Sequence, residues 1–485
     1  MQTRSPQVER LGPVIAAARS RVLLRPFVPG APERIKRVLK RVTALPPAEA
    51  GRMLNDVLAQ FRGRHRDLEE RFHRRFLEIR KFTSPRSQFT TEMQLLIGAY
   101  FCNEYAPEAA ALFNPSIVPD VSQEGVRPGA MRFVLSLRAT GEGHISSIEF
   151  LTGIIDKDGT VSLDERSPFV QTAQVVPDAL YETEEFSAKM KDEGHQSRTA
   201  KRLIDTLAPS FQRSALLSKI ARARMKKGLT KSVMADLNYL TDLAELNYTL
   251  RFPKSVPVSE RVIFPVSSFE SNGIEDARFV RLVGQDGRAR YYATYTAYNG
   301  QQIMPLLLET DDFAEFRVRS LSGAASRNKG MALFPRMIQG HYMMIARSDG
   351  ENLFCVSSRN LYSWQKPANL LRPQSPWEFI QIGNCGSPIE TAGGWLLLTH
   401  GVGPVRRYCI GAILLDLDDP SKVIGRLTDP LIAPDESERD GYVPNVVYTC
   451  GAIVHNGNLV IPYAASDQTC RFARVGLKDL LAAMK

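Results

Sequence analysis

The sequence lacks the patterns that mark several common protein classes. Its six cysteines include no C-x-x-C pair and no zinc-ligand spacing, which argues against a structural zinc site. No apolar run approaches the roughly 20 residues that span a bilayer, and the N-terminal segment shows no signal-peptide pattern. We therefore expect a cytoplasmic protein with reduced, mostly buried thiols and no membrane partner.

Motifs of familiar catalytic classes are also missing. The chain has no Ser-His-Asp order, no nucleophile elbow, no P-loop and no glycine-rich dinucleotide motif. His144 is not followed by a second histidine at the spacing of metal ligands. We therefore predict no bound metal.

The composition is otherwise that of a large globular protein. With 485 residues, 44% hydrophobic and 24% charged, the chain is long enough for more than one domain. Much of the net charge of +10 lies in residues 19–41 and 189–231, and neither segment interleaves exposed aromatic residues with basic ones. We predict no nucleic-acid partner. A basic surface that attracts an anionic substrate and a solvated helix face both account for the charge.

Two segments have helical periodicity. Residues 1–105 repeat apolar side chains at three- to four-residue spacing, and residues 180–248 do so with strongly basic residues between them. We interpret the first segment as an N-terminal helical region. The second is interpreted as a helical insertion that covers one side of a sheet.

Short strands dominate the rest of the chain. Apolar runs such as 290–298 and 394–400 are separated by turns. Many short strands without alternating helices indicate all-β packing, and their number is high for one sandwich. A propeller suits this length, although no strict repeat is present. We predict a mainly β fold, with residues 106–179 and 249–485 as the two parts of a propeller around the insertion at 180–248.

The segment 268–280 carries the strongest functional signal. A turn at 271–273 precedes two adjacent acids, Glu275 and Asp276, and then Arg278, directly before a strand-like run. A turn that presents a carboxylate beside a guanidinium can form a polar sugar site, which makes Asp276 the first candidate for a catalytic acid. The alternative is a turn with solvated acids that leads into a strand.

Further polar residues lie at predicted strand ends. Each alone is a weak signal, because a strand-end histidine is usually structural and a lone lysine or arginine is usually a surface charge. Together, a carboxylate, several cations and several amides suit a sugar site beside an anion site. The candidates are Asn114, Lys329, Arg347, His400, Asn445 and Asp467.

Several segments together form a familiar pattern. Residues 271–278 read Ser-Asn-Gly-Ile-Glu-Asp-Ala-Arg, and residues 328–335 read Asn-Lys-Gly-Met-Ala-Leu-Phe-Pro. Three later segments continue the pattern: 394–401, 411–424 and 442–448. In this order they resemble the motifs of glycoside hydrolase family 130, the inverting β-mannoside phosphorylases and related mannosidases. The resemblance covers residues 110–178 and 249–475.

The resemblance implies a fold and a reaction. It implies a five-bladed β-propeller with the sugar at the channel mouth, no cofactor, and inorganic phosphate as co-substrate. Asp276 matches the family's proton donor, whose proton can travel through a mannose hydroxyl to the glycosidic oxygen. Phosphate then attacks the anomeric carbon of a manno-oligosaccharide or other β-mannoside from the opposite face, giving mannose 1-phosphate with inverted configuration.

The resemblance also implies roles for single residues. Lys329 matches a phosphate ligand, and Arg347 and His400 match polar positions near it. The implied sugar contacts are Asn114, Arg138, Asn272, Arg278, Asn445 and Asp467.

Three departures from the family pattern keep alternatives open. Ala346-Arg347-Ser348 stands where the family has His-Arg-Pro, Thr399 replaces a tyrosine, and residues 386–388 read Gly-Ser-Pro in place of a proline-rich loop. Since these changes affect acceptor preference and phosphate use, an inverting hydrolase with a carboxylate that activates water is one alternative. A non-catalytic glycan-binding propeller is another. The helical additions fit either a homo-oligomer interface or a wall of the acceptor side.

Overall fold

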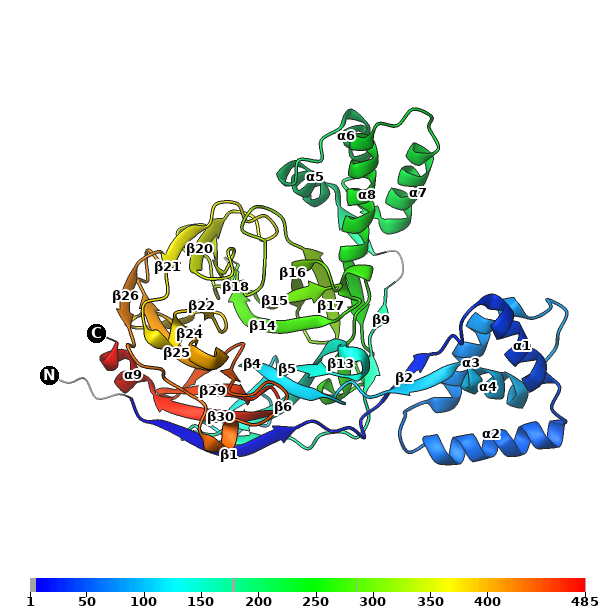
Figure 1. Cartoon of the computed structure of the whole chain (residues 1–485), viewed down its shortest axis with the longest axis horizontal. Coiled ribbons are helices and arrows are strands. Elements are labelled where there is room, and N and C mark those ends of the chain that lie inside the picture. The colour runs from blue at the N-terminus through cyan, green and yellow to red at the C-terminus, as the bar shows by residue number, and fades with distance from the viewer. Residues whose placement is uncertain (1–5, 177–178, 285, 485) are drawn as a thin grey trace.

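The computed structural model describes residues 6–176, 179–284 and 286–484, which form a mainly β body with two groups of helices (Figure 1). Within these residues, the β structure comprises five sheets of four to six strands and two two-stranded sheets. The prediction of a mainly β fold with helical additions is confirmed at this level.

The first two large sheets come from the first two thirds of the chain. The strands of the first are β4 (Ala111–Pro119), β5 (Met131–Thr140), β6 (Ser146–Ile155), β7 (Val161–Leu163), β8 (Gln171–Thr172) and β13 (Arg261–Ile263). Those of the second are β9 (Gln174–Val175), β12 (Tyr248–Arg251), β14 (Ile274–Val283), β15 (Ala289–Tyr298), β16 (Ile303–Thr310) and β17 (Glu315–Ser320). Their orders are β4-β5-β6-β13-β8 and β14-β15-β16-β17-β12-β9.

Three further large sheets follow. The third holds β18 (Ala332–Leu333), β19 (Tyr342–Ala346), β20 (Leu353–Ser358) and β21 (Ala368–Leu371). The fourth holds β22 (Gln381–Asn384), β23 (Ile389–Thr391), β24 (Gly394–Val402), β25 (Tyr408–Leu415) and β26 (Val423–Arg426). The fifth holds β1 (Val8–Ala16), β27 (Val447–Tyr448), β28 (Ile453–His455), β29 (Asn458–Ala465) and β30 (Thr469–Gly476), before the final helix α9 (Leu477–Ala483).

Strand β1 joins the two ends of the chain. It pairs antiparallel with β30, so that Val8 lies opposite Val475 and Ile15 opposite Cys470. The prediction that residues 1–105 are helical is wrong for this strand. Its sequence lacks regular alternation, and its partner lies more than 450 residues away, where local periodicity carries no information.

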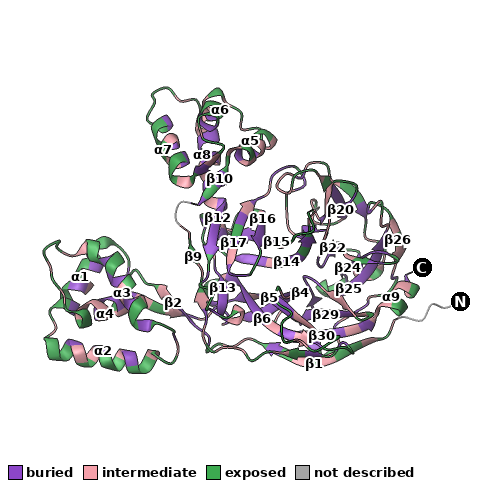
Figure 2. Ribbon diagram, turned by 180° about the vertical axis from the view of Figure 1, so that it is seen from behind, coloured by how far each residue is buried: buried purple, intermediate pink, exposed green. Residues whose placement is uncertain are grey.

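Each large sheet packs on the next through its own apolar cluster. Phe150 of the first sheet meets Phe279 of the second, for example, at 6.0 Å between ring centroids. Corresponding clusters join the second sheet to the third, the third to the fourth, and the fourth to the fifth. A further cluster joins the fifth sheet to the first, through Phe472 and Phe133. The strands of the β body are accordingly largely buried (Figure 2).

The two helical groups project from the β body (Figure 1). The N-terminal group contains α1 (Pro32–Thr43), α2 (Pro47–Phe61), α3 (Leu68–Ile79) and α4 (Thr91–Tyr100), attached through β2 (Leu23–Pro26) and β3 (Cys102–Tyr105). The second contains α5 (Thr183–Asp192), α6 (Arg198–Asp205), α7 (Arg213–Arg224) and α8 (Lys231–Leu246), with β10 (Leu180–Glu182) and β11 (Ser210–Gln212). Each has its own apolar core. The domain boundaries at 105, 179 and 248 stay predictions.

The cysteines agree with the sequence. All six are free thiols, five of them buried and Cys102 partly buried. The prediction of reduced, mostly buried thiols is confirmed for this structure.

Candidate functional site

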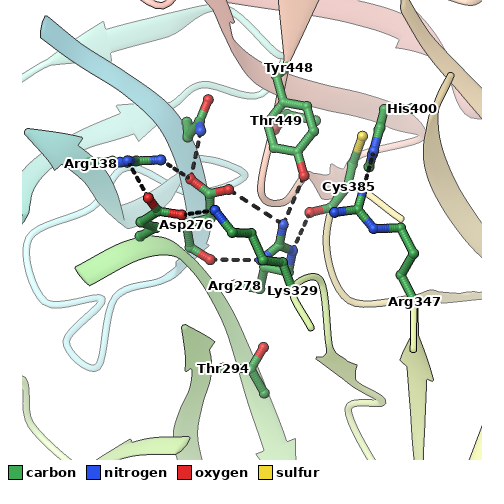
Figure 3. Close-up of polar contacts among 12 residues, drawn as sticks. Arg138, Asp276, Arg278, Thr294, Lys329, Arg347, Cys385, His400, Tyr448 and Thr449 are labelled. Carbon is green, nitrogen blue, oxygen red and sulfur yellow. Dashed lines mark hydrogen bonds and ion pairs between the residues drawn. The ribbon is translucent and has the colours of Figure 1, made fainter. Parts of the chain in front are cut away.

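A polar cavity of about 270 Å³ receives side chains from all five large sheets. Asn114 comes from β4, Asp276 from β14, Gln381 from β22 and Tyr448 from β27, while Arg347 directly follows β19. An edge strand from each of four sheets, and the residue after β19 of the third sheet, thus contribute to one site. Figure 3 shows how the charged side chains converge there.

Asn114 and Asp276 lie at backbone irregularities. The register of β4 against β5 shifts between Phe113 and Ser116, and that of β14 against β15 shifts between Glu275 and Arg278. The φ angles of Asn114 and Asp276 are +50° and +54°, which is uncommon for residues other than glycine. Such bulges redirect a side chain and concentrate at functional sites.

The Asp276 carboxylate is held by an amide and two guanidinium groups. Asn114 Nδ2 donates to Oδ1 at 2.7 Å, and Arg138 Nη1 donates to the same oxygen at 3.2 Å. Arg278 Nη2 lies 3.9 Å from Oδ2. Burial raises the pKa of Asp276, but the charges of Arg138 and Arg278 outweigh burial and bring the pKa to about 2. The carboxylate is therefore ionised at neutral pH in the ligand-free protein.

Arg278 supports Asp276 from behind the cavity wall. Its side chain is 2% exposed and donates to the carbonyl oxygens of Asp276 (2.9 Å) and Cys385 (3.1 Å). It also donates to the Tyr448 hydroxyl at 2.8 Å. Arg278 is thus a link between the second, fourth and fifth sheets (Figure 3).

Glu275 forms ion pairs with two cations. Arg138 Nη2 donates to Oε1 at 2.8 Å, and Lys329 Nζ donates to Oε2. Because Arg138 also contacts Asp276, one guanidinium joins both acids of the segment. The Lys329 side chain keeps 31% of its surface exposed and faces the cavity.

A cationic corner lies across the cavity. Arg347 Nη1 donates to His400 Nε2 at 3.1 Å, and within the described residues no carboxylate forms an ion pair with Arg347. Burial lowers the pKa of His400 well below its usual value, and the charges of Arg347 and Arg278 lower it further, so the imidazole is neutral.

Unpaired polar atoms cluster in the same corner. Among the described residues, Arg347 Nε, His400 Nδ1 and both polar side-chain atoms of Asn384 are buried without a hydrogen-bond partner. A buried donor without a partner costs about 1–3 kcal/mol. Such groups beside an unpaired cation fit a ligand with several acceptor oxygens, such as an oxyanion.

Asp467 is the third acid that lines the cavity, after Glu275 and Asp276. It has a φ of +51° and lines the wall on the fifth-sheet side. Burial raises the pKa of Asp467 to about 7; the charge of Arg138 opposes this rise, and that of Asp276 adds to it.

Seven predicted site residues meet in this cavity. They are Asn114, Arg138, Asp276, Lys329, Arg347, His400 and Asp467. Asn272 is exposed on the preceding turn, where its N–H donates to the Tyr298 carbonyl. Asn445 lies outside the lining residues and accepts from Arg439 Nε at 3.0 Å. Substrate contact by Asn272, Asn445 or the buried Arg278 stays a prediction.

Sequence reasoning missed other lining residues. Gln381, Arg406 and Tyr408 line the cavity but have no distinctive local pattern. Tyr448 ends the segment 442–448 that was part of the family pattern, so its position was signalled but its bond to Arg278 was not.

The described ranges of the chain contain no candidate for a metal site or for a membrane-spanning helix. No group of three or more His, Cys, Asp or Glu side chains there is placed to hold a metal ion. No helix there is long and apolar enough to cross a membrane.

The chain is similar to known carbohydrate-active proteins. The model of glycoside hydrolase family 130, described as beta-1,4-mannooligosaccharide phosphorylase, matches residues 193–485, more than half of the chain. A 1,2-beta-oligomannan phosphorylase from Thermoanaerobacter sp. is 34% identical over 215 residues, covering 44% of this chain and 71% of that protein. A beta-1,2-mannobiose phosphorylase from Listeria innocua is 30% identical over 227 residues, covering 45% of this chain and 62% of that protein.

Solved structures include similar chains. The structure of beta-1,2-mannobiose phosphorylase from Listeria innocua with beta-1,2-mannobiose aligns with a TM-score of 0.46 at 20% identity, covering 78% of this chain and 92% of that one. A putative glycoside hydrolase from Parabacteroides distasonis aligns with a TM-score of 0.48 at 17% identity, covering 78% and 90%.

Proposed function

Because the chain belongs to glycoside hydrolase family 130, we propose that it is a phosphorylase that cleaves a β-mannoside with inorganic phosphate and releases mannose 1-phosphate. The observation that carries this proposal is one cavity that holds the Asp276 carboxylate, the Lys329 cation close to it and the Arg347 cation at the other side (Figure 3). Phosphorolysis needs both a proton for the leaving oxygen and a held anionic nucleophile.

Asp276 is the proposed proton donor, and the cavity gives it a way to be protonated. With a pKa of about 2 it is ionised in the free protein. A bound sugar displaces water, and a bound phosphate offsets the cations that stabilise the carboxylate; both effects raise the pKa of Asp276. The proton then passes through a mannose hydroxyl to the glycosidic oxygen, and the bond from that oxygen to the anomeric carbon breaks.

Phosphate is the proposed nucleophile. Lys329 and Arg347 supply the positive charge, and the neutral His400 and Asn384 supply further polar contacts at the corner. A phosphate oxygen forms the new bond to the anomeric carbon from the face opposite the leaving oxygen, so the configuration is inverted. Asn114, Arg138 and Asp467 are the proposed sugar contacts. No cofactor is needed for this exchange.

The fold proposed for this reaction is a five-bladed β-propeller. Each large sheet is one blade, the edge strands β4, β14, β22 and β27 line the cavity, and β1 completes the last blade from the N-terminal end. The sequence of apolar clusters from sheet to sheet supports this arrangement. We retain residues 106–179 and 249–485 as the two propeller parts, and a cytoplasmic location stays a prediction.

An inverting hydrolase is the second candidate, and Asp467 is the observation that favours it. An acid with a pKa of about 7 beside the cavity can act as a base toward water near neutral pH. Glu275 is a poorer candidate because two cations already pair with it. In a hydrolase, Asp467→Asn would abolish release of free mannose.

A product assay separates the two functions. The purified protein is incubated with a panel of β-linked manno-disaccharides, with and without inorganic phosphate, and mannose and mannose 1-phosphate are quantified. We expect mannose 1-phosphate only in the samples with phosphate. Free mannose at equal rates in both samples would establish the hydrolase. Binding without cleavage in either sample would indicate a glycan-binding protein.

A further inference from the structure

The helical insertion contacts the loop that carries Lys329. We propose that Asp192, the last residue of α5, is a positioning residue that holds the loop 321–330 so that Lys329 faces the cavity. This inference rests on the proposed phosphorylase function. It assigns the insertion a part in phosphate use.

Asp192 joins two loop segments, one between β17 and β18 and the other between β20 and β21. Its Oδ2 accepts from Ser322 Oγ at 2.9 Å and from Ser363 Oγ at 2.5 Å. Ser322 and Ser363 are also joined by a parallel β-bridge. One carboxylate oxygen therefore fixes both sides of the point where the loop leaves the sheet.

The neighbouring residue of the insertion adds a second contact. Glu193 Oε1 accepts from the N–H of Gly323 at 3.0 Å. Gly323 has a φ of +96°, and a Cβ there would lie 2.4 Å from the Trp364 carbonyl oxygen, so this turn is tightly confined. The insertion thus bonds to the first two residues of a turn without regular strand structure.

Hydrogen bonds of the loop connect its anchored end to Lys329. Ser326 Oγ donates to the Ser322 carbonyl at 2.7 Å, and Ser348 Oγ donates to the Ala325 carbonyl at 3.3 Å. Asn328 then adopts a φ of +66° and accepts from the N–H of Lys329 at 2.8 Å. Only five residues separate Ser322 from Asn328, so a shift at the anchored end would reach Lys329.

The insertion is firmly attached to the β body at its base. Asn247, which follows α8, accepts from the N–H of Ser320 and donates to the Ser320 hydroxyl, both at 3.1 Å. Lys189 of α5 is 1% exposed, pairs with Glu185 and lies 5.4 Å from the Tyr362 ring. The base of the insertion is therefore rigid enough to fix a loop.

Helix stability does not explain an acid at position 192. A negative charge at the C-terminal end of a helix opposes the helix dipole, at a cost of about 0.3–1 kcal/mol. The bonds to Ser322 and Ser363 compensate for this placement. Replacing Asp192 should accordingly leave α5 folded while it releases the loop.

The test compares three variants of the full chain. Asp192→Ala removes the oxygen that accepts from both hydroxyls, and Asp192→Asn retains one acceptor oxygen. Glu184→Ala removes an exposed acid from the first turn of the same helix as a control. For each we measure KM for phosphate, KM for the mannoside, and hydrogen–deuterium exchange in peptides that span residues 321–330.

For Asp192→Ala we expect KM for phosphate to rise about 5- to 10-fold, KM for the mannoside to change less than about 2-fold, and exchange in 321–330 to increase. Asp192→Asn should recover most of the phosphate affinity, and Glu184→Ala should match wild type. Unchanged exchange, faster exchange without a change in KM for phosphate, or an equal rise in both KM values would each overturn the inference. A wild-type protein without phosphate-dependent turnover would instead refute the proposed function, whatever the loop exchange shows.

Discussion

Asn114 Nδ2 donates to Asp276 Oδ1 at 2.7 Å, and the two residues lie at matching bulges of β4 and β14, each with a positive φ. The strands are linked near this point by the N–H of Phe279, which donates to Ser116 Oγ at 3.0 Å. The amide therefore holds the candidate acid from a neighbouring sheet, and the geometry of both bulges is needed to form the contact.

Asn114→Gly tests this contact, because glycine accepts the positive φ while the amide donor is lost. The Asn114 bond lowers the pKa of Asp276, so we expect that pKa to rise in the variant. Because a proton donor acts in its protonated form, the alkaline limb of the kcat profile against pH should move to higher pH. An alkaline limb at the wild-type position would contradict the assigned role of the amide.

Asn114→Gly should also change stability in a defined pH window. The folded pKa of Asp276, about 2, lies below its unfolded value near 3.9, so ionised Asp276 stabilises the fold above pH 4 and this contribution is lost as pH falls from about 4 to about 2. Loss of a hydrogen bond to a charged group should cost about 1.5–3 kcal/mol at neutral pH. Urea unfolding at pH 7 and pH 3 measures the free energy of unfolding. We expect the difference in this free energy between variant and wild type to be smaller at pH 3.

Asp467→Asn tests a pH dependence of folding stability that is opposite in sign to that from Asp276. The folded pKa of Asp467, about 7, lies above the unfolded value, so between pH 4 and pH 7 the folded chain binds the extra proton and stability falls as pH rises. One such group contributes at most about 1.4 kcal/mol per pH unit. We expect the variant to have a flatter stability profile in this window by thermal unfolding. Parallel profiles for variant and wild type would argue against a buried, protonated Asp467.

Arg347→Met tests the cationic corner formed by Arg347 and His400. Since no carboxylate of the described chain forms an ion pair with Arg347, the substitution should leave the unfolding temperature nearly unchanged. Loss of a charge-assisted contact should raise KM for phosphate about 10-fold or more. Steady-state kinetics at fixed mannoside measures this effect. Unaltered KM for phosphate would remove Arg347 from the site.

Arg21→Met tests how the N-terminal segment is anchored. Arg21 Nη1 lies 2.5 Å from Glu108 Oε1 and 2.5 Å from Glu149 Oε2, with all three side chains at most 3% exposed. Removing the cation leaves two buried acids, which should cost about 3–5 kcal/mol in the free energy of unfolding. Arg62→Met breaks an exposed pair with Glu69 and should cost less than about 1 kcal/mol. Equal losses in the free energy of unfolding would show that the buried ion pairs contribute no more to stability than the exposed pair.

Local patterns in the sequence predicted individual strands and helices well. The predicted strands 290–298 and 394–400 are β15 and β24, and the helical insertion contains α5 to α8. These elements follow from apolar periodicity over a few residues. The pairing of β1 with β30 follows from a contact across nearly the whole chain, which no local pattern encodes.

The candidate site was predictable to the same extent. The turn before Asp276 and the strand-end position of His400 are local features, and both residues reach the cavity. Gln381 and the Arg278–Tyr448 bond depend on how separate sheets meet. Asn272 lies on the turn before Asp276 but is exposed to solvent, three residues ahead of the bulge that begins after Glu275.

The turnover number of Asp276→Asn, measured with saturating β-mannoside and phosphate, tests the central claim most directly. Asparagine has nearly the same shape but delivers no proton of this kind, so we predict a fall in kcat of about 10²- to 10⁴-fold with the unfolding temperature and phosphate affinity largely retained. A variant that releases mannose 1-phosphate within a few-fold of the wild-type rate would contradict the assignment of Asp276 as the proton donor.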